Sequence, residues 1–384
     1  MLINNLAKKI QNKILKGNQP FFFMSVEFQK KILKSFKAPS DLLERSYYQY
    51  LCQMKQLPLG LKLIQSLTAI FLTPYFYFKY SNDNGMTTGK IKKVAVFISG
   101  TKDISYVPRT LKDEFDEIIF CDYSGPYQLT AQEKRVIKQI YLRYWYKPYF
   151  CLKCMMKIAL YANQVYKNNP CAVLTFGEFS FTSSALTFYC REIGIKHINI
   201  MHGEKLFNIR DSFVKFDQYY VWDQHYMNLL VSLLADKGQF KIEVPEMVKL
   251  DIKKKIKHKY ELTYYLGGES EKELMNIRST LLGRNIPRER ICVRFHPRYS
   301  DKTQVSRIFS NFNIENPDEV PLNISLSQTK CVISLYSTVL FQAFKNGKEI
   351  IIDDITDSEK YEKLKKLRYI MLIKPHLRLS EIQF

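Results

Sequence analysis

The sequence lacks the short motifs that mark several large classes of enzyme. It contains no Walker phosphate-binding loop, no G-x-G-x-x-G dinucleotide fingerprint and no G-x-S-x-G nucleophile elbow. These absences argue against P-loop nucleotidases, dehydrogenases with that fingerprint and α/β-hydrolases. The chain still has 384 residues, enough for two or three domains, and 46% of them are hydrophobic, which predicts a folded protein.

Acidic residues are scarce relative to basic ones. Lys and Arg number 58 against 37 Asp and Glu, which gives a net charge of +21. Such an excess attracts nucleic acid, an anionic membrane surface or an anionic substrate, although a basic solvated surface is the plainer explanation. The charge is densest at 253–259 and 360–368. Because no zinc finger, RNA-recognition sequence or separate basic tail is present, we expect no nucleic-acid partner.

Cysteine pairs that would form a disulfide framework are also missing. Eight cysteines are scattered along the chain, far below the density of small secreted domains. Cys151 and Cys154 form a C-x-x-C, but no second pair stands at zinc-ribbon spacing. Their surroundings are helix-like, so we expect buried thiols rather than a metal site. Reduced thiols favour a cytoplasmic location.

No uninterrupted apolar run reaches the roughly 20 residues that cross a membrane. The most apolar stretch, 57–78, is interrupted by Lys62, Gln65 and Pro74. It either lies in a membrane interface, with lysines near lipid phosphates, or packs on the domain behind it. The segment 1–17 is amphipathic and basic and lacks the apolar core of a secretory signal. We expect a cytoplasmic protein that can sit peripherally on the inner face of the cytoplasmic membrane.

From residue 92 onward, short apolar runs alternate with longer helix-like segments. This rhythm predicts parallel sheets with crossover helices, and therefore an α/β fold. Expected strands are 92–99, 117–121, 172–176, 196–201, 218–222, 262–266, 290–295, 331–334 and 349–352. Expected helices are 132–166, 182–193, 271–282 and 339–345, with glycine caps at Gly194 and Gly347. We divide the chain into a helical region 1–88, a Rossmann-like domain 89–216 and a second Rossmann-like domain 217–384, with a turn-rich linker at 81–85.

Ionisable side chains follow two of the strands expected in the first domain. His202-Gly203-Glu204 follows one strand, and Gly203 permits a tight turn that aims both side chains outward. Ligands of open parallel sheets bind at the carboxyl ends of the strands. His has a suitable pKa for a general base unaided, and burial can tune Glu to the same role. Glu178 follows the neighbouring strand, where it can hold an acceptor, support the base or simply favour a helix N-terminus.

Phosphate-binding features follow two strands expected in the second domain. Ser334, Ser337 and Thr338 lie at a turn that opens a helix, whose free N–H groups and dipole favour an anion. Helix capping is the alternative role for these hydroxyls. About forty residues earlier, the same kind of position holds four further candidates, Arg294, His296, Pro297 and Arg298. We expect the two motifs to lie on adjacent strand ends and to bind a phosphate that gains charge as it leaves.

Three aspartates follow the last expected strand of the second domain. Asp353, Asp354 and Asp357 do not form the Asp-x-Asp pair of metal-dependent sugar transferases. They either contact the hydroxyls of a donor or cap a helix. No metal site is expected from them.

The elements VRFHPR and SLYSTVLFQAFKNGKEIII resemble motifs of bacterial GT-B sialyltransferases and polysialyltransferases. The resemblance covers about residues 170–355. In those families the His-Pro histidine and the Ser/Thr pair contact the cytidine monophosphate of the donor, and an acidic motif supplies the base. Here His202-Gly203-Glu204 stands in its place, an arrangement similar to the His-Gly of CDP-glycerol and CDP-ribitol polymerases. In that second family the histidine is the base.

The resemblance implies two Rossmann-like domains that face a cleft, with an acceptor domain followed by a donor domain. It implies a metal-independent, inverting glycosyltransferase without a cofactor, which transfers sialic acid or a related ulosonic sugar from a CMP-activated donor to a glycan of the bacterial surface, such as capsule or lipooligosaccharide. His202, Glu204 and His296 are the implied catalytic residues, and Glu178 is the implied acceptor contact. The alternatives are a CDP-polyol phosphotransferase, a transferase that uses a UDP- or GDP-sugar, and a basic protein that binds glycan or nucleic acid without catalysis.

Overall fold

The chain divides into two compact units in a computed structural model. The described residues are 24–81, 92–123, 127–252 and 258–382. The first unit contains Met1–His202 and Asn208–Glu243, and the second contains Gly203–Phe207 and Val244–Phe384. Three segments named above, the amphipathic stretch 1–17, the linker residues 82–85 and the basic residues 253–257, lie outside the described residues.

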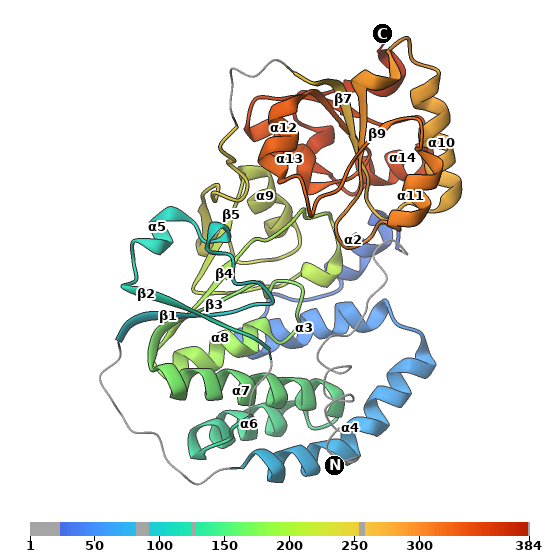
Figure 1. Cartoon of the computed structure of the whole chain (residues 1–384). Coiled ribbons are helices and arrows are strands. Elements are labelled where there is room, and N and C mark those ends of the chain that lie inside the picture. The colour runs from blue at the N-terminus through green and yellow to red at the C-terminus, as the bar shows by residue number, and fades with distance from the viewer. Residues whose placement is uncertain (1–23, 82–91, 124–126, 253–257, 383–384) are drawn as a thin grey trace. The chain divides into compact units, whose positions relative to one another are not determined.

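The first unit is built on a parallel six-stranded sheet in the order β2-β1-β3-β4-β5-β6 (Figure 1). Its strands are β1 (Lys92–Ile98), β2 (Glu117–Cys121), β3 (Pro170–Thr175), β4 (Lys196–Ile200), β5 (Gln218–Val221) and β6 (Phe240–Ile242). The expected boundary at 216/217 is shifted, because β5 pairs with β4 and β6 pairs with β5. Both strands therefore belong to the first unit, which ends at Glu243.

Eight described helices accompany this sheet. They are α2 (Val26–Lys34), α3 (Leu42–Lys55), α4 (Leu59–Tyr80), α5 (Arg109–Lys112), α6 (Ala131–Tyr144), α7 (Pro148–Asn168), α8 (Ser183–Glu192) and α9 (Gln224–Ser232). The single helix expected over 132–166 is in fact α6 and α7. Proline lacks an N–H group and clashes with the preceding turn, so a new helix starts at Pro148. Gly194 caps α8 with a φ of +76°, as expected.

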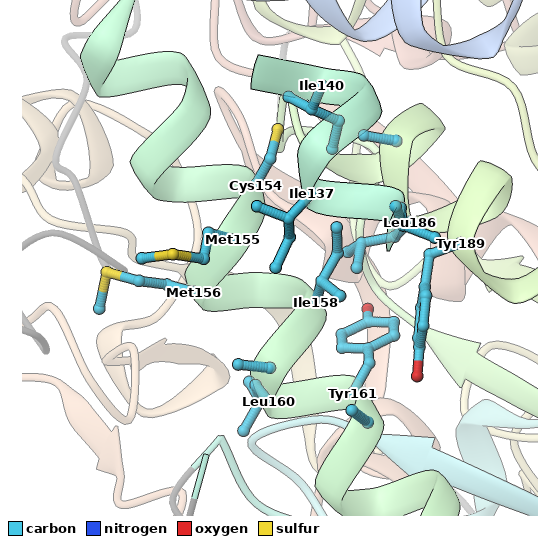
Figure 2. Packing of buried hydrophobic residues seen from close by; sticks show 14 of the residues in the cluster. Ile137, Ile140, Cys154, Met155, Met156, Ile158, Leu160, Tyr161, Leu186 and Tyr189 are labelled. Carbon is cyan, nitrogen blue, oxygen red and sulfur yellow. The ribbon is translucent and has the colours of Figure 1, made fainter. Parts of the chain in front are cut away.

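A large apolar core lies between the helices and one face of the first sheet. Figure 2 shows how side chains of α6, α7 and α8 meet there, among them Ile137, Ile158 and Leu186. Cys151 and Cys154 are buried free thiols of α7, which confirms the interpretation of the C-x-x-C. The core also takes residues from α3 and α4. The N-terminal helices are therefore an integral part of the first unit.

The second unit contains another parallel six-stranded sheet, in the order β12-β11-β10-β7-β8-β9. Its strands are β7 (Tyr260–Tyr265), β8 (Ile291–Arg294), β9 (Asn313–Glu315), β10 (Thr329–Ser334), β11 (Glu349–Ile352) and β12 (Leu377–Arg378). Its helices are α10 (Glu271–Leu282), α11 (Lys302–Ile308), α12 (Leu322–Gln328), α13 (Thr338–Lys345) and α14 (Ser358–Lys366). The chain runs outward from β7 through β8 to β9, and then from β10 through β11 to β12. This is the doubly wound order of dinucleotide-binding folds.

The two parallel sheets with crossover helices confirm the predicted α/β class with two Rossmann-like domains. Short 3₁₀ helices complete the connections at Ile104–Tyr106, Ile209–Asp211, Lys237–Gln239, Arg288–Arg290, Ile370–Leu372 and Leu379–Glu381. One detail of the prediction is wrong. The two phosphate-binding motifs do not stand on adjacent strand ends, because β7 lies between β8 and β10.

Candidate functional site

The loop after β3 carries a fully buried carboxylate at the point where the strand order of the first sheet reverses. Glu178 accepts a hydrogen bond from the Asn199 side chain (Oε2···Nδ2, 2.9 Å), and the same Asn199 accepts one from the Gly177 N–H (2.6 Å). A Cβ atom at Gly177 would lie 3.1 Å from Ser183 Oγ and 3.2 Å from Thr175 Oγ1. These distances are tighter than ordinary contact, so the loop needs glycine at this position to place Glu178.

Helix α3 holds this loop from the other side. Three of its polar residues at helical spacing are buried. Their side chains donate hydrogen bonds to three carbonyl groups of the loop: Ser46 to Phe181, Gln49 to Glu178 (2.9 Å) and Gln53 to Phe179 (3.1 Å). A buried carbonyl group without a partner costs free energy, so these bonds fix the loop on the helix. No local sequence pattern indicates these bonds, since the partners are far apart along the chain.

Glu178 meets His202, the residue that follows β4 and Met201. Glu178 Oε1 lies 3.5 Å from His202 Nδ1, and the His202 side chain keeps 35% of its surface exposed while that of Glu178 has none. The ring of His202 packs against Phe176 (4.7 Å between centroids) and Phe179 (6.0 Å). A carboxylate at Nδ1 orients the imidazole and leaves Nε2 as the nitrogen that can accept a proton.

Two lysines of α7 lie near the same loop and were not singled out from the sequence. The Lys153 side chain is buried, and its Nζ lies 5.9 Å from the ring of Tyr149 and 5.8 Å from that of Phe181. Burial first, and the like charge of Lys157 second, lower the pKa of Lys153 to about 7. Burial also lowers the pKa of Lys157 to about 8, and its Nζ lies 4.6 Å from the ring of Tyr123.

Glu204 lies in the second unit, not in the unit of His202. Only 8% of Glu204 is exposed, and its carboxylate lies near the Tyr369 hydroxyl. Burial first and this carboxylate second raise the pKa of Tyr369 well above its usual value. The φ of Gly203 lies outside the left-handed region. A Cβ atom at Gly203 would sit 4.0 Å from Thr338 Oγ1, which is ordinary contact.

His296 follows β8 in a loop that is tied back to β7. Its N–H donates to Ser300 Oγ (2.8 Å), whose hydroxyl donates to the Gly267 carbonyl (2.8 Å). Burial first and the charge of Arg298 second lower the pKa of His296, which favours the neutral ring. Since its Nδ1 accepts the Arg298 N–H (3.0 Å), the proton resides on Nε2. The ring stacks on Tyr299 at 4.5 Å and offers a neutral N–H donor.

Two of the expected donor contacts are internal instead. Arg294 is 6% exposed, and its guanidinium pairs with Glu315 (3.1 Å). Ser325 also donates to Glu315, and the Tyr265 and Ser325 hydroxyls are 2.8 Å apart, which completes a buried polar network. Ser334 is 1% exposed. Strand residues alternate between faces, so these side chains point into the unit rather than toward a ligand at the strand ends. Pro297 and Arg298, in contrast, are exposed.

Ser337 and Thr338 stand at the start of α13, as expected. The Ser337 hydroxyl caps the helix by accepting the Val339 N–H (3.2 Å), which is the alternative role that the sequence left open. The Tyr369 hydroxyl donates to the Ser337 carbonyl (3.0 Å) and lies 3.4 Å from its N–H. The turn is therefore held rigid, and both residues are half-buried with some surface exposed.

Two glycines follow shortly after the strand that lies between the two phosphate-binding motifs. Because β7 separates β8 from β10, the motifs begin about 10 Å apart, two strand spacings. Gly267 and Gly268 carry no side chain into this interval, and Gly268 packs on Tyr299. The strand order reverses between β7 and β10, which is where doubly wound sheets bind nucleotides. A nucleotide that lies across the end of β7 would have His296 on one side and Ser337 on the other.

The aspartates after β11 act as structural hydrogen-bond acceptors. Asp353 is fully buried and accepts from the Tyr264 hydroxyl (2.6 Å), Asp354 accepts from Ser380 (2.5 Å), and Asp357 caps α14. The capping alternative is therefore confirmed for Asp357 alone, while Asp353 and Asp354 accept hydrogen bonds from other residues of the unit. Within the described ranges, no group of three or more His, Cys, Asp or Glu side chains is placed to hold a metal ion.

No protein-family model matches the chain, and no curated protein matches it. Several solved structures are similar. A putative UDP-N-acetylglucosamine 2-epimerase from Listeria monocytogenes is 13% identical over 71% of this chain and 82% of its own, with a TM-score of 0.43. The same enzyme from Neisseria meningitidis, bound to UDP-GlcNAc, is 13% identical over 70% and 84%, with a TM-score of 0.43. The glycosyltransferase of kitacinnamycin is 8% identical over 76% and 87%, with a TM-score of 0.44. At these identities the similarity concerns the fold alone.

Proposed function

We propose that the chain is a glycosyltransferase of the GT-B type that transfers sialic acid or a related ulosonic sugar from a CMP-activated donor to a hydroxyl group of a glycan acceptor. The observation that carries the proposal is the contact between the buried Glu178 carboxylate and His202 at the strand ends of the first unit. Orientation of a partly exposed imidazole by a buried carboxylate is the arrangement of a general base. The predicted surface glycan, capsule or lipooligosaccharide, is the product that the sequence motifs favour.

In this mechanism His202 Nε2 takes the proton of the acceptor hydroxyl as its oxygen attacks the anomeric carbon. The bond from that carbon to the phosphate oxygen breaks, and CMP leaves with the electron pair. His296 Nε2–H and the start of α13, with Ser337 and Thr338, stabilise the charge that develops on the phosphate. Fixed N–H and O–H donors supply this stabilisation, so the proposal requires no metal ion or cofactor. Inversion follows from the single displacement.

The assignment of Glu178 changes in this proposal. It supports the base rather than contacting the acceptor, because its side chain is fully buried against Asn199 and His202. Glu204 is the weaker candidate for the base, since it is 8% exposed and lies beside Tyr369. The acceptor contacts pass instead to the surroundings of His202. Lys153, whose Nζ lies 5.8 Å from the ring of Phe181 in the loop that carries Glu178, favours an acceptor with negative charge.

A CDP-polyol phosphotransferase is a second candidate, and one observation favours it. His202, the histidine that the Glu178 carboxylate contacts, belongs to the element His202-Gly203. This element resembles the His-Gly that supplies the base in the CDP-glycerol and CDP-ribitol enzymes. That reaction also releases CMP, so both candidates share the donor nucleotide. They differ in the transferred group, a sugar in one case and a polyol phosphate in the other. Eight free cysteines support a reducing, cytoplasmic location for either enzyme.

A thermal-shift panel of CMP, CDP, UDP, GDP and ADP tests the donor nucleotide. We expect stabilisation by CMP and CDP only, by about 2.7 kcal/mol at a hundred times the dissociation constant. His296→Ala should lose most of this stabilisation because it removes the Nε2–H donor. His376→Ala is the matched control, a histidine of the same unit that bonds the Lys374 carbonyl instead. It should respond as the wild type does.

Each alternative outcome has a definite meaning. Stabilisation by UDP or GDP alone would replace the cytidine donor by another nucleotide sugar. No stabilisation by any nucleotide would favour a binding protein without catalysis. If CMP and CDP bind, release of CMP from CMP-sialic acid and from CDP-glycerol, measured side by side with a glycan acceptor, separates the two candidate reactions.

A further inference from the structure

Helix α4 exposes an unusually large apolar surface. Only Ala69, Phe76 and Tyr80 of its 22 residues are buried, and these pack in the core of the first unit. Nine large apolar side chains are at least 41% exposed, with Phe71 at 75% and Phe78 at 74%. The exposed set is Leu59, Leu61, Leu63, Ile64, Leu67, Ile70, Phe71, Tyr75 and Phe78. A soluble surface rarely carries so continuous an apolar patch unless something binds there.

The helix is long and apolar enough to cross a membrane by composition, but its packing argues for another position. Its 18 most apolar consecutive residues have a mean hydropathy of 1.2, and only 11% of this stretch is buried. Ala69, Phe76 and Tyr80 hold one side of α4 on the folded unit, in contact with the core that α7 helps to form. A spanning position would pull these three side chains out of that core. An orientation along a surface exposes the apolar side and keeps the core intact.

A groove between α4 and α6 borders this patch and combines apolar walls with positive charge. Its volume is about 610 Å³. The walls come from Thr73, Pro74, Tyr77, Phe78, Ala131, Ile137 and Tyr141, and the cations are Lys134, Arg135 and Lys138. The lining contains no acidic residue, and α4 has none along its length. These three cations give the lining an excess of positive charge, which favours an anionic partner.

The exposed side of α6 continues the pattern. Helical spacing places Leu142 and Trp145 on the same stripe as Lys134 and Lys138. Leu142 and Trp145 are each 72% exposed, and the neighbouring Tyr146 is 50% exposed. Exposed tryptophan and tyrosine beside lysines are typical of surfaces that sit at the membrane–water interface.

We propose that α4 and the exposed stripe of α6 form a membrane-binding face that lies in the headgroup layer of an anionic bilayer. The apolar side of α4 enters the acyl boundary, an acyl chain fits the groove, and lipid phosphates contact Lys134, Arg135 and Lys138. Apolar area and positive charge together match a lipid surface, whereas a protein partner of this size would require acidic side chains opposite the groove. The inference is independent of the proposed reaction.

Vesicle binding of the full chain tests the proposal. We expect cosedimentation with vesicles of phosphatidylcholine and phosphatidylglycerol, and weak binding to phosphatidylcholine alone. Lys134→Gln, Arg135→Gln and Lys138→Gln combined should weaken binding about a hundred-fold, at roughly fivefold per charge. Lys272→Gln, Lys365→Gln and Lys366→Gln combined are the control, since all three are exposed and remove the same charge from the second unit. Leu67→Gln with Phe71→Gln should also weaken binding, by on the order of a hundred-fold.

Tryptophan fluorescence gives a second, site-specific readout. The chain has two tryptophans, of which Trp145 is 72% exposed and Trp222 is 1% exposed. Vesicles should shift the emission to the blue, and Trp145→Phe should abolish the shift without abolishing sedimentation. Equal binding to both vesicle types, an equal loss in the control triple variant, or an unchanged Trp145 emission would overturn the proposal. A wild-type dimer that Leu67→Gln with Phe71→Gln converts to a monomer, with no vesicle binding, would assign the face to a second copy instead.

Discussion

The polar side chains at the strand ends have different kinds of partner in the two units. In the second unit most of them bond to one another: Arg294 pairs with Glu315, Asp353 accepts from Tyr264, and Ser337 caps its own helix. In the first unit the equivalent edge brings a buried carboxylate, Glu178, against a histidine that remains partly exposed. The second unit therefore presents side chains that are largely fixed by internal hydrogen bonds, while the first presents a histidine in contact with a buried carboxylate.

The same contrast holds for the buried cations. The guanidinium of Arg294 lies 3.1 Å from a carboxylate. The Nζ atoms of Lys153 and Lys157 lie over aromatic rings, and burial lowers the pKa of both lysines. Burial of a charged amine away from water costs folding free energy, and groups whose pKa is shifted in this way cluster at functional sites. In our proposal, the buried charge of the second unit belongs to the fold, whereas that of Lys153 serves the substrate.

The largest expected effect comes from removing the partly exposed histidine of the first unit. His202→Ala should reduce kcat by about 10²- to 10⁴-fold, because it removes the group that accepts the proton. CMP should still stabilise the variant against heat, since the donor contacts belong to the second unit. Steady-state transfer assays and thermal shifts measure the two effects separately.

Two further variants identify the base. Glu178→Gln should lower kcat less than His202→Ala and should shift the acidic limb of the pH–rate profile, because the carboxylate orients the ring and stabilises its protonated form. Glu204→Gln should leave that limb in place. A full loss of transfer in Glu204→Gln, with His202→Ala still active, would move the base to Glu204.

The next prediction concerns the buried Arg294–Glu315 ion pair of the second unit. Arg294→Ala should destabilise the chain by about 3–5 kcal/mol, because it leaves the Glu315 carboxylate buried without its cation. Arg294→Met with Glu315→Leu should recover much of this loss. Urea denaturation measures both variants. If the double variant folds but no longer responds to CMP, Arg294 contacts the donor after all.

Much of the fold was predictable because the central strands are buried apolar runs bounded by turns. The nine expected strands are all present, whereas β6, β9 and β12 were missed, since each has only two or three residues and a weak pattern. The break before Pro148 was also missed, because α6 and α7 read as one continuous helical pattern. Strands with a clear apolar run were therefore predictable from the sequence, whereas very short strands and a break within a continuous helical pattern were not.

The candidate site was predictable only in part. Following the strand ends located His202, Glu178, His296 and Ser337, because carboxyl ends of parallel strands share one edge of a sheet. Side-chain direction was not predictable for Arg294, which turned out to point inward. The bonds of α3 to the Glu178 loop depend on contacts between residues more than a hundred positions apart, which no local pattern reports.

The smallest expected effect separates substrate binding from stability in the first unit. Burial depresses the pKa of Lys153 to about 7, below its usual value, so the unfolded chain binds the proton more tightly than the folded one. Stability contributed by this group therefore rises with pH from about 7 toward 10.5 and is lowest below 7. Lys153→Met should raise the free energy of unfolding by on the order of 1–2 kcal/mol at pH 6, and this gain in stability over the wild type should shrink as pH increases.

The same variant should raise the KM of an anionic acceptor several-fold below pH 7, where the wild-type lysine is charged, and should leave a neutral acceptor unaffected. Lys272→Met, an exposed lysine of the second unit, is the control. A variant that is less stable than the wild type at pH 6 would show that Lys153 serves the fold, and the contrast between the two units would then fail at this residue.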